Sequence, residues 1–233
     1  MTSNNAIIPI AYYILKKGNP ESFILSINYK DDREKIDQWL KCSLLKRSFS
    51  GQPDNVLNPI TKVIQENTDA FPIDQIVERF KGTNKSLKFT EEDLESLLTY
   101  KYNEAYSFSV LSLLYPTLDY RNQFHKDHIH PKSFFKKSEL RKKGIPDWQH
   151  ERFIENVDYI GNLQLMEGLP NEEKNNTDFK EWLENTYPNI NERKEVMRNN
   201  YIPENIDFSF RNFPMFIEER NKLILNALRK ILL

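Results

Sequence analysis

The residues best suited to chemistry lie in the middle of the chain, beginning with the run Lys126-Asp127-His128-Ile129-His130-Pro131-Lys132-Ser133-Phe134-Phe135. In this run an acidic residue and a histidine close a short apolar stretch. A second run, Gly161-Asn162-Leu163-Gln164-Leu165-Met166, places an asparagine at the start of another apolar stretch. A further asparagine, Asn171, then stands just before a predicted helix that also carries Lys174. The chain therefore presents a carboxylate, an imidazole and amide side chains in a fixed order.

These residue types suit hydrolysis assisted by a hard metal ion. Histidine is the natural general base near neutral pH, because its unperturbed pKa is about 6.5. A carboxylate and an amide carbonyl supply the oxygen ligands that Mg²⁺ prefers, and they leave positions for water and a phosphate. Phosphodiester hydrolysis needs this combination of a base, a cation on the scissile phosphate and charge stabilisation on the leaving oxygen. Asp127 is the one obvious acidic ligand in the pattern, which favours a single metal ion.

The patterns Asp-His-Ile-x-Pro, Gly-Asn-Leu and Asn-x-x-Lys at these offsets resemble those of the HNH, or His-Me finger, endonucleases. The site of those enzymes is a ββα unit with one divalent metal ion. The block from Asp127 to Ser133 is most similar to the C-terminal nuclease half of GmrSD-type, modification-dependent restriction enzymes. The resemblance is most specific between residues 126 and 176 and weaker in the flanks. It implies a metal-dependent endonuclease that hydrolyses DNA phosphodiester bonds in the restriction of foreign or modified DNA.

The resemblance also implies roles for individual residues. His128 matches the general base, and Asp127 and Asn171 match the two metal ligands. Asn162 matches the middle asparagine of the catalytic set, which ties the loop by hydrogen bonds from its side chain to the backbone. Lys174 matches a lysine that lies near the substrate phosphate or behind a ligand. The implied cofactor is one divalent ion, expected to be Mg²⁺, with Mn²⁺ or Ni²⁺ as alternatives.

Two more residues are expected to contact substrate. Strand alternation places His130 on the same face as His128, where it either meets a phosphate or supports a ligand; packing is the open alternative. Lys132 begins a basic cluster that only Glu139 opposes. A solvated helix face is the ordinary interpretation of such a cluster, but its position beside the Asp-His pair favours DNA contact. The cluster consists of Lys132, Lys136, Lys137, Arg141, Lys142 and Lys143.

Composition limits the class of protein. The 233 residues carry a formal net charge of −1, so the chain as a whole does not attract nucleic acid and a local patch must do so. The single cysteine, Cys42, excludes an intrachain disulfide and a cysteine-based zinc knuckle, and it is expected to be a buried small hydrophobe. No apolar run approaches the roughly 20 residues of a membrane span. We expect a cytoplasmic protein without a membrane segment.

The elements that position the site divide the sequence into three regions. Residues 1–120 show helical periodicity, with one helix starting at either Asp54 or Asn58-Pro59 and another at Thr90. Residues 121–186 hold the nuclease core, and residues 187–233 are helices packed on that core. The prediction is an α+β fold, mostly α-helical, with an embedded ββα-metal unit.

Within the core, the sequence predicts strands at 124–129 and 159–166 and a metal-site helix at 170–176. A basic helix is predicted at 133–143, ended by Gly144. A further helix at 148–156 is expected to carry His150 on an exposed face, and His125 is expected to be a flanking residue.

Two expectations concern partners. GmrSD-type enzymes combine this region with an NTPase and target-sensing domain, whereas residues 81–86 lack the spacing of a phosphate-binding loop and are better explained as a turn. An NTPase or target-sensing subunit or domain is therefore an expected partner, besides DNA. The alternative is a non-catalytic module of a restriction complex that binds DNA or a partner through the same ββα surface. The presence of Asp127, His128 and Asn171 together favours the enzyme, because a binding module has no need of all three.

Overall fold

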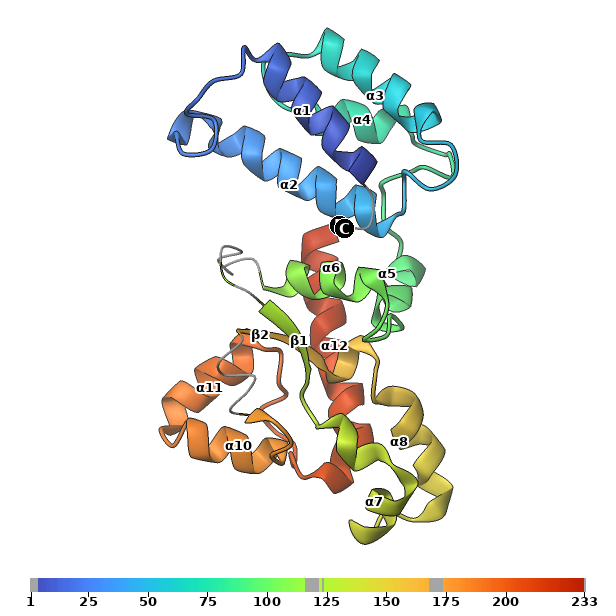
Figure 1. Ribbon diagram of the computed structural model, residues 1–233, viewed down its shortest axis with the longest axis vertical. Coiled ribbons are helices and arrows are strands. Elements are labelled where there is room, and N and C mark those ends of the chain that lie inside the picture. The colour runs from blue at the N-terminus through green and yellow to red at the C-terminus, as the bar shows by residue number, and fades with distance from the viewer. Residues whose placement is uncertain (1–3, 116–121, 123, 168–173, 233) are drawn as a thin grey trace. The chain divides into compact units, whose positions relative to one another are not determined.

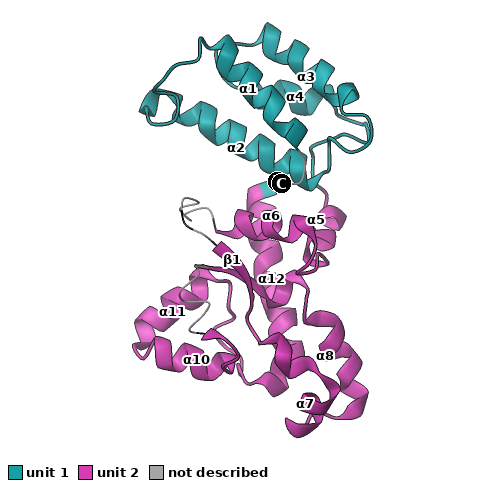
Figure 2. Cartoon of the chain, in the orientation of Figure 1, with its two compact units in different colours: residues 1–89, 232 teal, residues 90–231, 233 magenta. Residues whose placement is uncertain are grey.

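The computed structural model describes residues 4–115, 122, 124–167 and 174–232 (Figure 1). The chain forms two compact units that divide between Phe89 and Thr90, coloured separately in Figure 2. The divisions predicted at 120/121 and 186/187 both fall inside the second unit.

The first unit is helical. Short 3₁₀ helices at Asn4–Ala6 and Ile27–Tyr29 precede α1 and α2, and α1 packs against α3. Its helices are α1 (Ile7–Lys16), α2 (Lys30–Leu45), α3 (Asp54–Glu66) and α4 (Ile73–Arg79). Of the two predicted starts for α3, Asp54 is correct, and Pro59 lies inside the helix.

The core of this unit is an apolar cluster that includes the fully buried Trp39. Cys42 is buried, as expected for a small hydrophobe. The carboxylate of Asp32 is buried in the same region and accepts hydrogen bonds from the hydroxyl of Tyr13 at 2.7 Å and the backbone N–H of Phe71 at 2.8 Å. Two donors satisfy the buried charge, so this carboxylate joins α1, α2 and the segment before α4.

The second unit is mostly helical around one small antiparallel sheet. A capping box between Thr90 and Asp93 starts the first helix at the predicted place. The α-helices are α5 (Glu91–Leu98), α6 (Ala105–Leu114), α7 (Lys137–Lys142), α8 (His150–Asn156), α10 (Phe179–Thr186), α11 (Ile190–Asn199) and α12 (Phe213–Leu232). Short 3₁₀ helices lie at Lys132–Phe135, Asp147–Gln149, Ile160–Asn162 and Phe210–Asn212.

The sheet consists of β1 (Phe124–His128) and β2 (Leu163–Glu167), paired so that Asp127 faces Gln164 and His128 faces Leu163. The predicted α+β fold, mostly helical with two short strands, is therefore confirmed. Helix α6 contacts β2 and the 3₁₀ turn before it. The predicted helix at 170–176 lies mainly outside the described residues.

Some predicted boundaries are wrong. Residues 160–162 form a 3₁₀ turn, so β2 begins at Leu163 rather than at 159, and the predicted basic helix is interrupted by Lys136 in an extended conformation. Gly144 ends α7 with a φ of +72°, as predicted. His150 is buried rather than exposed. Its ring nitrogen Nε2 forms a hydrogen bond with the carbonyl oxygen of Ile145 at 2.9 Å.

The core of the second unit is rich in phenylalanine. Residues of α12, α10 and the loop after β1 form one buried cluster, which includes Phe213, Phe216, Phe179 and Ile129. In the described part of the chain, no helix combines the length and the apolar composition that a membrane span requires.

Candidate active site

Neighbouring side chains of β1 project to opposite faces of the hairpin, and their contacts divide in the same way. On one face the imidazole of His128 stacks on the ring of Tyr102, with centroids 4.7 Å apart and planes 20° apart. On the other face Asp127 lies opposite Gln164, whose Nε2 donates to its Oδ2 at 2.8 Å. The histidine and the carboxylate of the Asp-His pair thus have separate supporting side chains.

The imidazole of His128 is held by contacts on its face and its edge. Its Nε2 lies 2.8 Å from Oδ1 of Asp158, and Tyr102 covers the ring face. Its other nitrogen, Nδ1, has no hydrogen-bond partner among the described residues and is not one of the buried unpartnered atoms. Nδ1 is therefore the nitrogen that remains accessible to solvent.

Asp158 is a carboxylate between two cationic or protonatable groups. Lys132 Nζ lies 2.9 Å from its Oδ1 and 2.7 Å from its Oδ2. Burial acts to raise the pKa of Asp158, but the hydrogen bonds from Lys132 and His128 outweigh it and hold that pKa below its ordinary value. At neutral pH this carboxylate is ionised, so it accepts a hydrogen bond from the N–H at Nε2 of His128.

The protonation of His128 itself follows from two opposed effects. Burial lowers the pKa of the imidazole, and the hydrogen bond that it donates to Asp158 acts to raise it; the net result is a pKa below the ordinary value. His128 is consequently neutral at neutral pH. With the proton on Nε2, the lone pair of Nδ1 is free to accept a proton from another molecule.

The Tyr102 and Asp158 segments are joined through the backbone as well. The N–H of Tyr102 donates to the carbonyl oxygen of Asp158 at 2.8 Å, and Lys101 forms an isolated antiparallel bridge with Tyr159. Lys126, two residues before His128 on the same face of β1, donates to the carbonyl oxygen of Tyr102. The face of the hairpin around His128 is therefore built from three chain segments far apart in the sequence.

Asp127 is held by a buried lysine. Lys174 Nζ lies 2.7 Å from Oδ2 of Asp127 and donates to the carbonyl oxygen of His128 at 2.5 Å, and the lysine is fully buried. Burial lowers the pKa of Lys174, while the charge of Asp127 acts to raise it. Of the two positions predicted for Lys174, this internal ion pair fits the one behind a ligand rather than contact with substrate.

The described residues fit part of a single-metal site. Oδ1 of Asp127 has no hydrogen-bond partner among them, so one hard oxygen is free to bind a cation. Asn171, the second predicted ligand, lies outside the described residues. The described segments contain no cluster of three His, Cys, Asp or Glu side chains suited to a metal. A site with one or two protein oxygen ligands suits Mg²⁺, which keeps several waters of its hydration shell.

Asn162 ties the loop after β1 to the turn before β2. Its Oδ1 accepts from the backbone N–H of His130 at 2.9 Å, and its Nδ2 donates to the carbonyl oxygens of His130 at 3.1 Å and Val157 at 2.9 Å. The side chain is fully buried. These bonds also explain the late start of β2, because they hold residues 160–162 in a turn.

Helix α12 also supports the turn at residues 160–162. The fully buried guanidinium of Arg220 donates to the carbonyl oxygens of Ile160 at 3.1 Å and Gly161 at 2.8 Å. Gly161 approaches α12 so closely that an added Cβ would lie 2.5 Å from Oδ1 of Asn221. A side chain at position 161 would therefore force the side chain of Asn221 to shift.

The expected substrate contact of His130 is wrong, and packing, the open alternative, is correct. The side chain is fully buried, and four phenylalanine rings surround it with centroids 4.8 to 6.0 Å away. Strand alternation does not extend to this residue because β1 ends at His128. Both ring nitrogens of His130 lack a hydrogen-bond partner, and burial lowers its pKa to about 3.

The basic cluster is mostly exposed, and acidic neighbours partly neutralise it. Arg141 pairs with Asp147 at 3.0 Å, and Lys142 pairs with Glu139 at 2.8 Å. Lys132 combines a half-exposed side chain with its ion pair to Asp158. His125, on β1, is exposed and lies outside these contacts.

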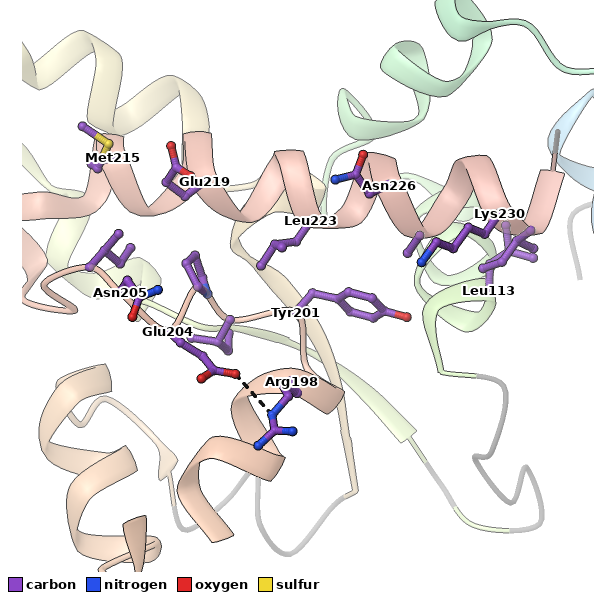
Figure 3. A pocket seen from close by; sticks show the side chains of 15 residues that line it. Leu113, Arg198, Tyr201, Glu204, Asn205, Met215, Glu219, Leu223, Asn226 and Lys230 are labelled. Atoms are coloured by element: carbon purple, nitrogen blue, oxygen red, sulfur yellow. Dashed lines mark ion pairs between the residues drawn. The ribbon is translucent and has the colours of Figure 1, made fainter. Parts of the chain in front are cut away.

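A groove of about 1060 Å³ lies elsewhere in the second unit, between α12 and residues 201–206 (Figure 3). Its lining is largely apolar and includes Met215 and Leu223, with an ion pair between Arg198 and Glu204 at 3.2 Å. None of the residues of the Asp-His pair or its supports lines it.

Sequence reasoning did not find Tyr102, Asp158 or the support from Gln164. Tyr102 and Asp158 have no spacing relation to the Asp-His pair, because they reach it through the pairing of residues 101–102 with 158–159. Gln164 carried a usable signal. An antiparallel pairing of the two predicted strands with Gly161-Asn162 at its open end places this polar residue opposite Asp127.

A known protein family matches the segment of the chain that contains the hairpin. No curated protein matches the chain. The family model of the GmrSD restriction endonuclease C-terminal domain matches residues 73–208, which include both strands, Tyr102, Asp158 and Lys174. The match covers more than half of the chain, and with it the whole hairpin site. The chain therefore belongs to the family of GmrSD restriction endonuclease C-terminal domains.

Proposed function

We propose that this protein is a metal-dependent HNH endonuclease that hydrolyses DNA phosphodiester bonds, with His128 as the general base. The observation that carries the proposal is the set of contacts around the His128 imidazole. Asp158 and Tyr102 hold the ring, burial favours its neutral form, and Nδ1 alone remains accessible. A neutral imidazole with a free lone pair is the form that removes a proton from an attacking water.

In this proposal the carboxylate of Asp127, through Oδ1, and the side chain of Asn171 hold one divalent ion, most readily Mg²⁺, with Mn²⁺ or Ni²⁺ as alternatives. The ion supplies a positive charge at the scissile phosphate and at the leaving oxygen. Lys174 and Gln164 fix Asp127 by binding its Oδ2, so that the other oxygen stays directed away from them. Asn162 acts by holding the loop that follows His128.

DNA is the proposed substrate because Lys132, the first residue of the mostly exposed basic cluster from Lys132 to Lys143, contacts Asp158 at the site. Positive side chains next to the base bind the phosphates on either side of the scissile bond. Following the family, we propose that the biological role is restriction of foreign or modified DNA. Choice of target then belongs to an NTPase or target-sensing domain or subunit that acts with this one.

Cleavage of a supercoiled plasmid tests the proposal. The purified protein should convert supercoiled DNA to the nicked form in Mg²⁺ or Mn²⁺, and excess EDTA should stop the reaction. Asp127→Asn should weaken metal binding, measured by calorimetry, and slow nicking in parallel. Asp147→Asn is the matched control, since Asp147 is an exposed carboxylate outside the site. Nicking at equal rates in metal and in EDTA would contradict the metal dependence.

A further inference from the structure

We infer that Asp158 is a positioning residue for His128, and that Lys132 determines how Asp158 acts on the imidazole. The inference rests on the proposed function for its effect on cleavage, but its effect on the imidazole can be measured without DNA. Neither the contact between Asp158 and His128 nor the contact between Asp158 and Lys132 follows from a sequence pattern. The contacts among Asp158, Lys132, Tyr102 and His128 carry the argument.

Asp158 selects the tautomer of His128. An ionised carboxylate has acceptor oxygens only, so the 2.8 Å contact between Oδ1 and Nε2 requires the proton to be on Nε2. The same contact leaves Nδ1 unprotonated. Because only Nδ1 is accessible, the carboxylate places the basic nitrogen of the ring on the side from which a substrate can approach.

Asp158 is itself fixed from two directions. Lys132 Nζ contacts both carboxylate oxygens, at 2.9 and 2.7 Å, and the carbonyl oxygen of Asp158 accepts the N–H of Tyr102 at 2.8 Å. Tyr102 also stacks on the imidazole. Rotation of the His128 ring out of its plane would therefore break a hydrogen bond and a stacking contact together.

These contacts predict that Asp158→Asn lowers kcat more than Asp158→Ala does. In Asp158→Asn the amide has one acceptor oxygen and one donor NH₂ group. The ammonium of Lys132 only donates, so it takes the amide oxygen, and the NH₂ group then faces Nε2 and donates to it. The His128 proton moves to Nδ1, where it blocks the base. In Asp158→Ala water replaces the carboxylate and both tautomers exist.

The near-isosteric variant should therefore be the worse one. Asp158→Asn should lower kcat by about 10³- to 10⁴-fold, as for a triad histidine held in the wrong tautomer. Asp158→Ala should lower kcat by only about 10- to 100-fold. KM should change little in either variant, because an interaction needed only in the chemical step is lost.

Removal of Lys132 should restore part of the kcat that Asp158→Asn loses. In the double variant Lys132→Met with Asp158→Asn, the amide is free to turn its oxygen toward Nε2–H. The kcat of this double variant should exceed that of Asp158→Asn at least tenfold, even if Lys132→Met alone raises KM. A purely structural role for Asp158 predicts the opposite, since two substitutions would then be at least as damaging as one.

The ¹⁵N NMR shifts of the His128 side chain provide the readout that does not involve cleavage, with the signals assigned by comparison with His128→Ala. Wild-type protein at pH 7.5 should show the proton on Nε2, and Asp158→Asn should show it on Nδ1. The matched control is Asp147→Asn, because Asp147 also pairs with a basic residue and lies 3.6 Å from a histidine, His150.

Each result decides a separate claim. An unchanged His128 tautomer in Asp158→Asn, or a kcat for Asp158→Asn no lower than that for Asp158→Ala, overturns the positioning role. If the tautomer changes as expected but the wild-type protein never cleaves DNA, the positioning role stands and the proposed function is wrong. Thermal unfolding of each variant shows whether the fold is intact.

Discussion

At the scale of single residues, the site depends on which atoms are already occupied. Nε2 of His128 is hydrogen-bonded to Asp158, and Oδ2 of Asp127 accepts hydrogen bonds from Lys174 and Gln164. What remains is one ring nitrogen and one carboxylate oxygen, which are the atoms that a general base and a metal ligand need. The supports thus define the chemistry as much as the Asp-His pair does.

Buried His130 predicts an acid-sensitive fold. Its pKa is lowered to about 3 in the folded protein, whereas the unfolded chain binds a proton near pH 6.5. As the pH falls from 6.5, the unfolded state binds protons first, so stability decreases until the pH nears 3. At pH 5 the loss from this residue is about 2 kcal/mol relative to neutral pH.

The measurement is urea unfolding of wild-type protein and His130→Leu at pH 7.5 and pH 5. The wild-type protein should lose about 2 kcal/mol more between these values than the variant does. Because His128, His125 and His150 are present in both proteins, the difference isolates His130. Equal losses in the two proteins would show that His130 is protonated in the folded state, and the buried position would be wrong.

At this scale the sequence was a good guide to residue type and a poor guide to neighbours. Asp127 and His128 stand out because the Asp-His-Ile-x-Pro pattern occurs together with Gly-Asn-Leu and Asn-x-x-Lys at fixed offsets. His130 was misplaced because alternation was continued past the end of the strand, which no propensity marks. Asp158 was missed because its contact with His128 depends on how two loops pair.

At the scale of elements, the hairpin is positioned by helix α12 and by the turn at Gly161. Arg220 satisfies the carbonyl oxygens of that turn, and Asn162 satisfies the loop after β1. The helices and both strands could be predicted from periodicity, and Thr90 and Gly144 marked real ends. The turn at 160–162 could not, since the side chains of Asn162 and Arg220 hold it through hydrogen bonds with residues far apart in the sequence.

Packing at Gly161 gives a test of this arrangement. In Gly161→Ala the new Cβ would lie 2.5 Å from Oδ1 of Asn221 and 3.3 Å from Cγ2 of Ile217, both on α12. Relief of such contacts costs about 1–3 kcal/mol of unfolding free energy. Urea denaturation should show this loss, and nicking should slow because Asn162 moves.

A second substitution makes the test specific. Oδ1 of Asn221 is buried without a partner, so Asn221→Ala removes the main clash at little cost of its own. The double variant Gly161→Ala with Asn221→Ala should regain most of the lost stability. Additive losses in the double variant would mean that the cost of Gly161→Ala does not arise from contact with α12.

At the scale of the whole molecule, the near-neutral charge limits what the chain does by itself. The net charge of −1 leaves DNA attraction to the basic cluster, three of whose members, Lys132, Arg141 and Lys142, pair with acidic residues. DNA binding should be weak and should fall steeply with salt. Lys132→Gln should reduce the slope of log affinity against log salt by about 1. An unchanged slope would place the DNA away from the cluster.

The proposed role of an NTPase or target-sensing domain or subunit can be tested with nucleotides. The phosphate-loop spacing is absent from the sequence, so the purified chain should nick plasmid slowly, with little sequence preference and at the same rate with and without GTP or ATP. The assay compares initial nicking rates at fixed free Mg²⁺, because nucleotides bind the metal. Strong stimulation by either nucleotide would show that the chain senses nucleotides itself.

The central claim is that His128 is the general base of a nuclease, and single-turnover plasmid nicking in Mg²⁺ tests it most directly. His128→Ala should slow the chemical step by at least about 10²-fold, while fluorescence anisotropy shows nearly unchanged DNA binding and calorimetry nearly unchanged metal binding. His125→Ala, an exposed histidine of the same strand, is the matched control and should cleave at the wild-type rate. Cleavage by His128→Ala at the wild-type rate would contradict the account.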